Sequence, residues 1–446
     1  MKQLFNSQWL FHKEPLETPI ETFYHVEDWQ AVDLPHDWMI YDSDDLYHQG
    51  VSCYKKTFTV DGLGTDRLFL LFEGVYMNNT IYLNGKEIFY WPYGYSGFEI
   101  DITDHLIAGE NTIYVKNVYE LPNSRWYPGS GIYRNVWMIR RPDLHLVTDG
   151  IYLATEKNEN NWTLHIDTEI QNDTSVESTV TLCHTILDPS GAEIQSQTET
   201  VNTPAGIQVN KLVMSFDQPA LWDIQSPNLY RIRTELIIDD KVVDTDTQNF
   251  GFRTIRFDPE QGFFLNDRPV KINGSCEHHT LGAVGAAMNK EAVRRQLVTM
   301  QAMGVNAIRS AHNMPSVELM DLCDEMGLLL YTESFDMWER CKTDYDYGNY
   351  FTEWWQKDLT SWVRQDRNHP SLFIWGIGNE IHDINYDRGL ELTCMLRDAV
   401  RDLDYYGNAV IAMGSNIMGG EGAQKCANEV DLVGYNYSEK LYDEHH

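Results

Sequence analysis

Residues 368–381 have the sequence NHPSLFIWGIGNEI, and this stretch decides the fold class of the C-terminal part of the chain. After Pro370 comes a nearly continuous apolar run made of Leu372, Phe373, Ile374, Trp375 and Ile377. Such a run is typical of a strand covered on both faces, as in a parallel sheet. In an α/β barrel, the loops at the carboxyl ends of the strands build the active site. Glu380 follows the strand directly and is therefore the first candidate for a catalytic carboxylate.

From about residue 256 the sequence around this strand alternates strands with helices, which indicates a parallel sheet. Six strands are predicted, over residues 269–276, 305–310, 328–333, 371–378, 408–414 and 430–436. One helix is expected between the N-cap Asn289 and Gly304, and another between Ser316 and Gly327. Their predicted inward-facing residues are Val293, Leu297 and Met300, and Leu319, Leu322 and Met326. Because an eight-stranded barrel needs two further units, the pattern fits an open α/β fold or an incomplete barrel.

The first 255 residues read as two β-sandwiches. Within residues 1–142, strand candidates at 54–60, 67–73, 79–83, 111–118 and 135–140 are separated by Gly and Asn turns, which favours a jelly roll. Asn84-Gly85 predicts a hairpin turn with positive φ at both residues. Residues 143–255 contain about seven short alternating strands, which is typical of an immunoglobulin-like sandwich. Residues 256–446 then form the third predicted domain.

Composition limits the partners of the protein. The net charge of -33, from 34 Lys plus Arg against 67 Asp plus Glu, repels nucleic acid and anionic membranes. A neutral sugar fits better, since the 13 Trp and 25 Tyr offer faces that pack on sugar rings, although most of them should fill sandwich cores. The segment RWYPGSGIYR, residues 125–134, is expected to pack in the core or to present Trp126 and Tyr127 to a ligand.

The cysteines and the hydrophobic pattern favour a cytoplasmic location. Seven cysteines are scattered without a CxxC pair, which argues for reduced thiols. The N-terminus has no apolar segment long enough for a signal peptide, and no transmembrane run is visible. The sequence leaves open whether the protein forms a homo-oligomer.

Polar residues gather where the predicted parallel strands end. They are Glu277, His278, His279, Arg309, His312, Glu333, Asp336, Asn379, Glu380, Tyr435, Asn436 and Tyr437. Any one of these could be structural, but as a set they favour a functional site at this face.

The motifs limit the chemistry of this site. Adjacent histidines on an extended segment point apart, and no HExxH motif is present, so a metal site is disfavoured. GxSxG and P-loop motifs are also absent, which disfavours a serine nucleophile and a phosphate loop. Carboxylate chemistry remains, and we expect Trp375 to help raise the pKa of Glu380.

Several segments now identify a resemblance. NHPSLFIWGIGNEI resembles the acid/base signature of glycoside hydrolase family 2, which contains β-galactosidases, β-glucuronidases and β-mannosidases. RWYPGSGIYRNVW is similar to the end of that family's N-terminal sugar-binding jelly roll. GFRTIRFDPEQGFFLNDRPVKINGSCEHH is similar to its entry into the TIM barrel, and GVNAIRSAHNMPSVELMDLCDEMGLLLYTESFDMW to the second and third barrel strands. The barrel motifs are closest in style to bacterial β-galactosidases, although Thr280 replaces an Asp that relatives often carry.

The resemblance implies residue roles. Glu380 would be the general acid/base of a retaining mechanism on β-linked glycosides, and Asn379 would bind the hydroxyl next to the reacting carbon. His278, His312, Asp336 and Trp338 would line the sugar pocket. Arg309 and Tyr437 would support the nucleophile. Tyr435 is a less favoured match for the position assigned to Tyr437. No cofactor is required, and the sequence leaves open whether the protein binds Mg²⁺ or Na⁺.

One expected feature is missing. The family's nucleophile is a Glu at the end of the seventh barrel strand, and this sequence stops after the sixth. Glu439 and Glu444 come too early and are expected to face solvent. Because retention needs two carboxyls about 5 Å apart, the chain alone is predicted to be inactive.

The sequence leaves alternatives to a β-galactosidase-like function. They are β-glucuronidase or β-mannosidase specificity and a non-catalytic carbohydrate-binding remnant. A complete hydrolase that uses one carboxylate or a metal has little support.

Overall fold

The C-terminal part of the chain is built on one parallel sheet. The computed structural model describes residues 1–42, 44–62 and 64–445. Its six parallel strands are, in spatial order, β21 (Gly274–Glu277), β22 (Ala307–Ser310), β23 (Leu329–Glu333), β24 (Leu372–Asn379), β25 (Val410–Ser415) and β26 (Leu432–Tyr435). This confirms the predicted six-stranded partial barrel. All eight residues of β24 are buried, as its apolar sequence predicts.

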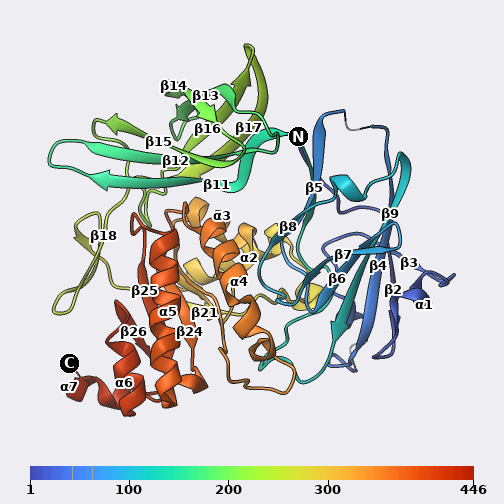
Figure 1. Ribbon diagram of the computed structural model, residues 1–446. Helices are drawn as coiled ribbons and strands as arrows, with labels where there is room; N and C mark the ends of the chain where they lie inside the picture. Colours follow the sequence, from blue (N-terminus) through green and yellow to red (C-terminus); the bar gives the residue numbers. More distant parts are fainter. Residues whose placement is uncertain (43, 63, 446) are drawn as a thin grey trace.

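Helices connect these strands and cover the outer face of the sheet (Figure 1). They are α2 (Lys290–Ala302), α3 (Val317–Met326), α4 (Phe351–Asp366), α5 (Asp387–Leu403), α6 (Glu421–Ala427) and α7 (Tyr442–His445), with the short turns η3 (Gly282–Val284), η4 (Tyr347–Asn349), η5 (His382–Asn385) and η6 (Glu439–Leu441). Asn289 and Ser316 cap α2 and α3 as predicted. Glu439 and Glu444 are exposed, also as predicted.

The inward faces of α2 and α3 are predicted correctly only in part. Val293, Leu297 and Leu322 are buried, whereas Met300, Leu319 and Met326 are half-buried. The fully buried positions of α3 are instead Met320, Leu322, Cys323 and Asp324. Met300, Leu319 and Met326 still pack against the hydrophobic core, and Asp324 adds polar contacts from α3 to the segment before β24.

Two antiparallel sheets form the N-terminal jelly roll. One contains β1 (Lys2–Leu4), β10 (Val136–Pro142), β5 (Asp66–Phe72) and β8 (Phe98–Asp101), in that order. The other contains β3 (Gln30–Val32), β2 (Trp9–Glu14), β4 (Gly50–Val60), β9 (Gly109–Tyr119), β6 (Asn79–Leu83) and β7 (Lys86–Trp91). The short helical segments are α1 (Ile20–Phe23), η1 (Trp38–Tyr41) and η2 (Thr103–His105). Asn84 and Gly85 have φ values of 53° and 77°, which confirms the predicted turn between β6 and β7.

The second sandwich has the predicted seven strands. A three-stranded sheet contains β11 (Leu144–Lys157), β12 (Trp162–Asn172) and β15 (Gly206–Phe216). It packs against β14 (Glu193–Thr203), β13 (Ser178–Leu187), β16 (Tyr230–Ile238) and β17 (Lys241–Phe250). The small sheet β18 (Ile255–Asp258), β19 (Gly262–Leu265) and β20 (Arg268–Pro269) leads into the parallel sheet. Among the described residues, no helix has the length and apolarity needed to cross a membrane.

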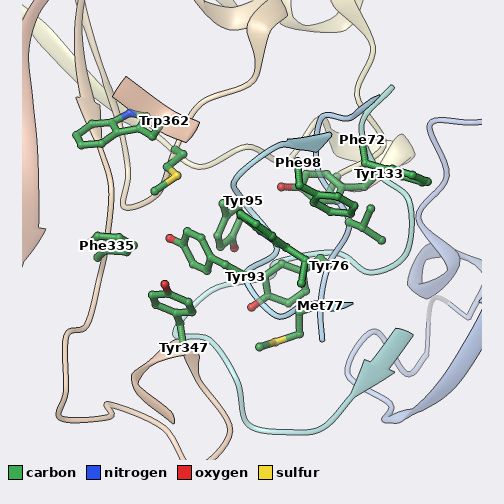
Figure 2. Packing of buried hydrophobic residues seen from close by; sticks show 14 of the residues in the cluster. Phe72, Tyr76, Met77, Tyr93, Tyr95, Phe98, Tyr133, Phe335, Tyr347 and Trp362 are labelled. Carbon is green, nitrogen blue, oxygen red and sulfur yellow. The ribbon is translucent and has the colours of Figure 1, made fainter. Parts of the chain in front are cut away.

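The jelly roll and the parallel-sheet domain share one hydrophobic core, and the sheets of the second sandwich enclose two cores of their own. Trp222, near the end of the second sandwich, packs in a further core with Leu329 and Phe373 of the sheet domain. Figure 2 shows aromatic side chains of the jelly roll meeting those of the sheet domain. The Tyr93 ring lies 4.0 Å from the Tyr347 ring and 5.6 Å from the Phe335 ring, measured between centroids, and its hydroxyl donates to the Ser334 carbonyl. The jelly roll is thereby fixed beside the carboxyl ends of the parallel strands.

Candidate active site

An open cavity of about 430 Å³ lies at the carboxyl ends of the parallel strands. Its walls are formed by Arg125 and Trp126 from the jelly roll and by Cys276, His278, Arg309, Ala311, His312, Glu380, Asn436 and Tyr437 from the sheet domain. Of the twelve polar residues that follow the predicted strands, six line this cavity: His278, Arg309, His312, Glu380, Asn436 and Tyr437. Among the residues that the structure describes, Glu380 is the one carboxylate in this wall.

Glu380 leaves the end of β24 with a positive φ of 49°, and its amide donates to the Gly414 carbonyl. Its carboxylate accepts one hydrogen bond from Arg125 Nη1 at 3.0 Å and another from Asn436 Nδ2 at 3.1 Å. Burial acts to raise the pKa of Glu380, but these two hydrogen bonds and the positive charges of Arg125 and Lys342 hold it below its usual value. The carboxylate form is therefore favoured.

Trp375 does not raise the pKa of Glu380, so that expectation is wrong. Its indole nitrogen donates to Asp404 Oδ2 at 2.8 Å, and its ring packs against Trp362 with 4.9 Å between centroids. Successive side chains of a strand point to opposite faces, and Trp375 lies on the helix-covered side. The local charges at the end of β24 decide the pKa instead.

Asp336 is buried below Glu380 and is surrounded by donors. It accepts from Arg125 through both oxygens, from Lys342 Nζ at 2.9 Å and from Asn379 Nδ2 at 2.9 Å. Burial would raise its pKa, but these hydrogen bonds and charges hold it below the usual value. Lys342 also donates to the Asn379 carbonyl at 2.7 Å. Asp336 is thus ionised and fixes the positions of the Arg125, Lys342 and Asn379 side chains.

A second network links β22, β23 and β24. Arg309 Nη2 donates to Glu333 Oε1 at 2.6 Å and to Asn379 Oδ1 at 2.9 Å. His312 Nδ1 lies 2.7 Å from the other oxygen of Glu333, which is fully buried. Burial alone would lower the pKa of Arg309, but Glu333 raises it. Asn379 is therefore held by both networks, through Arg309 and Asp336.

The two histidines of the cavity lie against a jelly-roll aromatic. The His278 ring is 4.9 Å from the Trp126 ring and 5.7 Å from the His312 ring. Burial, followed by the neighbouring His312, lowers the pKa of His278, so the neutral ring is favoured at neutral pH. Within the described part of the chain, no three His, Cys, Asp or Glu side chains are grouped to hold a metal ion.

Three of the residues considered for the site, Trp338, Tyr437 and Tyr435, lie differently from the others. Trp338 is fully buried, and its indole nitrogen donates to the Ile377 carbonyl at 2.9 Å, so it packs behind the cavity wall. Tyr437 lines the cavity but is 85% exposed, with a positive φ of 54°. Tyr435 points elsewhere, with its hydroxyl 3.1 Å from His445 Nδ1. Glu380, Asn379, His278, His312, Asp336 and Arg309 are brought together.

Sequence reasoning missed Arg125 and Lys342. Both lie on connecting segments between strands, and only the packing of the two domains brings Arg125 to Glu380. The aromatic segment containing Arg125 was a usable signal, and it does supply Trp126 to the cavity. Tyr127 instead donates to the buried Asp37, away from the cavity.

A jelly roll, an immunoglobulin-like sandwich and a partial parallel barrel with a glutamate at its carboxyl edge form the domain arrangement that the resemblance to the multidomain glycoside hydrolases of family 2 implies. Three family descriptions match the chain in order: the sugar binding domain of glycosyl hydrolases family 2 over residues 23–142, glycosyl hydrolases family 2 over 145–253, and its TIM barrel domain over 258–445. The chain belongs to glycoside hydrolase family 2.

Individual relatives agree with this membership. The chain is similar to beta-galactosidase BoGH2A of Bacteroides ovatus, with 39% identity over 84% of this chain and 46% of the relative. A putative beta-glucuronidase of Formosa agariphila is 36% identical over 85% of this chain and 37% of its own length. A solved family 2 member from Bacteroides cellulosilyticus superposes with a TM-score of 0.92 and 32% identity over all of this chain and 60% of that one. The chain thus spans about half the length of its relatives.

Proposed function

We propose that this chain contributes the acid/base half of the active site of a retaining β-glycosidase, with Glu380 as the general acid/base. One observation carries the proposal: the Glu380 carboxylate stands on the open cavity at the carboxyl end of a fully buried barrel strand. In this role Glu380 protonates the leaving glycosidic oxygen and then removes a proton from the attacking water.

The electrostatics of the site support both roles of Glu380. The hydrogen bonds from Arg125 and Asn436 favour its carboxylate form, which the second step needs. A glycoside covering the cavity would remove solvent from the carboxylate, and burial favours the protonated form that the first step needs. We assign substrate binding to Asn379, His278, His312 and Asp336, with Trp338 supporting the wall from behind. Arg309 and Tyr437 are assigned to support of the nucleophile.

The proposed substrate is a terminal β-galactoside. Its support is the 39% identity to a relative named a beta-galactosidase, while other relatives are named beta-glucuronidases. The described residues supply one carboxylate to the cavity, and double displacement needs two about 5 Å apart. We therefore expect the 446-residue chain by itself to lack turnover.

The test compares two proteins. The first is the 446-residue chain, which should release nitrophenol from nitrophenyl β-galactoside no faster than buffer. The second is a chimera in which this chain replaces the matching segment of the Bacteroides ovatus relative, and it should hydrolyse the galactoside faster than the glucuronide or the mannoside. Turnover by the 446-residue chain that Glu380→Gln abolishes would contradict the proposal. A chimera as inactive as the isolated chain would favour the carbohydrate-binding alternative.

The remaining features of the proposal follow from the sequence and the sheets. We propose domains at residues 1–142, 143–255 and 256–446, because each range contains its own set of sheets. A cytoplasmic location is supported by seven free cysteines. The mechanism uses carboxylates and requires no cofactor.

A further inference from the structure

Arg125 connects the jelly roll to Glu380 in the cavity wall and to the buried Asp336 beneath it. Its Nε and Nη2 donate to the two oxygens of Asp336, and its Nη1 donates to Glu380 Oε2 at 3.0 Å. A bidentate hydrogen bond to a carboxylate fixes the plane of a guanidinium group. Because Asp336 is itself held by Lys342 and Asn379, the remaining Nη1 of Arg125 has a defined position relative to Glu380.

The segment that carries Arg125 is anchored on both domains. The Trp126 indole donates to the Tyr95 hydroxyl, and Tyr127 donates to Asp37 at 2.7 Å. Asp37 also accepts from the backbone amides of Ser130 and Ala286, so it joins the jelly roll to the loop after β21. Gly129 approaches Asp37 so closely that a Cβ atom would lie 2.9 Å from its carboxylate. The backbone around Arg125 is therefore fixed before any ligand binds.

We propose that Arg125 is the positioning residue for Glu380: the jelly roll, through this one guanidinium, holds the acid/base carboxylate at the cavity wall. The inference rests on the proposed role of Glu380 and extends it across the domain boundary. It also means that the site of the third domain is incomplete without the first.

Charge balance at the site explains what Arg125 does to Glu380. Two carboxylates, Asp336 and Glu380, face two cations, Arg125 and Lys342. Without Arg125 one carboxylate loses its counter-ion, and Asp336 keeps direct bonds from Lys342 and Asn379. The loss of a counter-ion then raises the pKa of Glu380. The other titratable or charged groups on this cavity are Cys276, His278, Arg309, His312 and Tyr437.

The test is a pH titration of glutamate side-chain carboxyl ¹³C signals in the 446-residue chain, with the Glu380 signal assigned by its loss in Glu380→Gln. In Arg125→Gln the midpoint of Glu380 should rise by about one pH unit or more. Arg125→Lys, which keeps a charge but cannot contact both carboxylates in the same way, should raise it by less. Thermal unfolding checks that each variant is folded.

Arg388 supplies the matched control, since it bridges Glu339 and Glu391 on the surface away from the cavity. Arg388→Gln should leave the Glu380 midpoint unchanged. The proposal is overturned if the Glu380 midpoint in Arg125→Gln equals that of the wild type, or if Arg388→Gln raises the Glu380 midpoint as much as Arg125→Gln does. If Arg125→Gln does not fold, a wild-type midpoint in Arg125→Lys overturns it. The titration needs no turnover, so this outcome is independent of whether Glu380 proves to be the acid/base.

Discussion

At the scale of single residues, charged groups are held by partners that are distant in sequence. His369, in the stretch before β24, is enclosed by the domain, and its Nδ1 lies 2.6 Å from Asp324 Oδ2 on α3. The other oxygen of Asp324 accepts from the Ser371 amide at 2.9 Å. Burial alone would lower the pKa of His369, but the charge of Asp324 raises it to about 9. The pair therefore joins the end of α3 to the start of β24 in an ionic form.

This pair predicts a pH-dependent contribution to stability. Because the folded pKa of His369 lies above its ordinary value of 6.5, its contribution is fully present below about pH 6.5 and is lost as the pH rises through about 9. The advantage of wild type over His369→Gln should reach at most roughly 3 kcal/mol at the acidic end. Thermal unfolding of both proteins across this range measures it.

A control distinguishes the pair from general effects of pH. His25 is exposed in a jelly-roll loop, and His25→Asn should follow wild type at every pH. A difference between wild type and His369→Gln that stays constant across the range, or that grows with pH, would contradict the assignment.

Only those site residues that come directly after a parallel strand in the sequence could be predicted. Glu380, Asn379, His278, His312 and Arg309 are identifiable because the carboxyl ends of parallel strands meet at one edge. Arg125 and Lys342 lie on connections, whose direction is set by tertiary packing. The direction of the Glu380 pKa shift is predicted wrongly, because the hydrogen bonds from Asn436 and Arg125 and the charges of Arg125 and Lys342 outweigh burial.

At the scale of elements, β24 and the capped helices follow directly from the sequence. The apolar run of β24 and the side-chain caps Asn289 and Ser316 are local signals, so the strand and both helix starts are predicted correctly. β21 is less well predicted, since the strand begins at Gly274 and the preceding residues connect it to β20. Residues 269–276 are apolar enough for a longer strand, but the pairing with β22 starts only at Gly274.

At the scale of the whole molecule, Arg134 fastens the jelly roll to the sheet domain. Its guanidinium is buried and donates to the carbonyls of Met314, Pro315 and Tyr95 at 2.7, 3.1 and 3.0 Å. Met314 and Pro315 lie between β22 and α3, so one side chain ties the jelly roll to the barrel. The Arg134 guanidinium lies 5.2 Å from the ring centroid of Tyr133, which belongs to the shared core shown in Figure 2.

Arg134→Met keeps the apolar stem but leaves these buried carbonyls without donors. We expect a loss of about 3 kcal/mol, because each unsatisfied buried acceptor costs roughly 1 kcal/mol or more. Hydrogen exchange should accelerate in residues 73–77 and 313–318, while the strands of the second sandwich, which has its own cores, should exchange as in wild type. Arg401→Met, at a half-exposed ion pair with Asp431, is the matched control and should change neither region. Uniform acceleration across all three domains would contradict a local role for Arg134.

The central claim is that Glu380 is a proton donor, and the dependence of kcat/KM on the leaving group tests it most directly. In the chimera, Glu380→Ala should reduce kcat/KM far more for β-galactosides with poor leaving groups, such as lactose, than for dinitrophenyl β-galactoside, which needs little protonation. Glu439→Gln, at an exposed glutamate beyond β26, should leave both values at those of the unmodified chimera. The account predicts this difference between the two substrate types in Glu380→Ala. Equal losses on both would show that Glu380 is not the general acid.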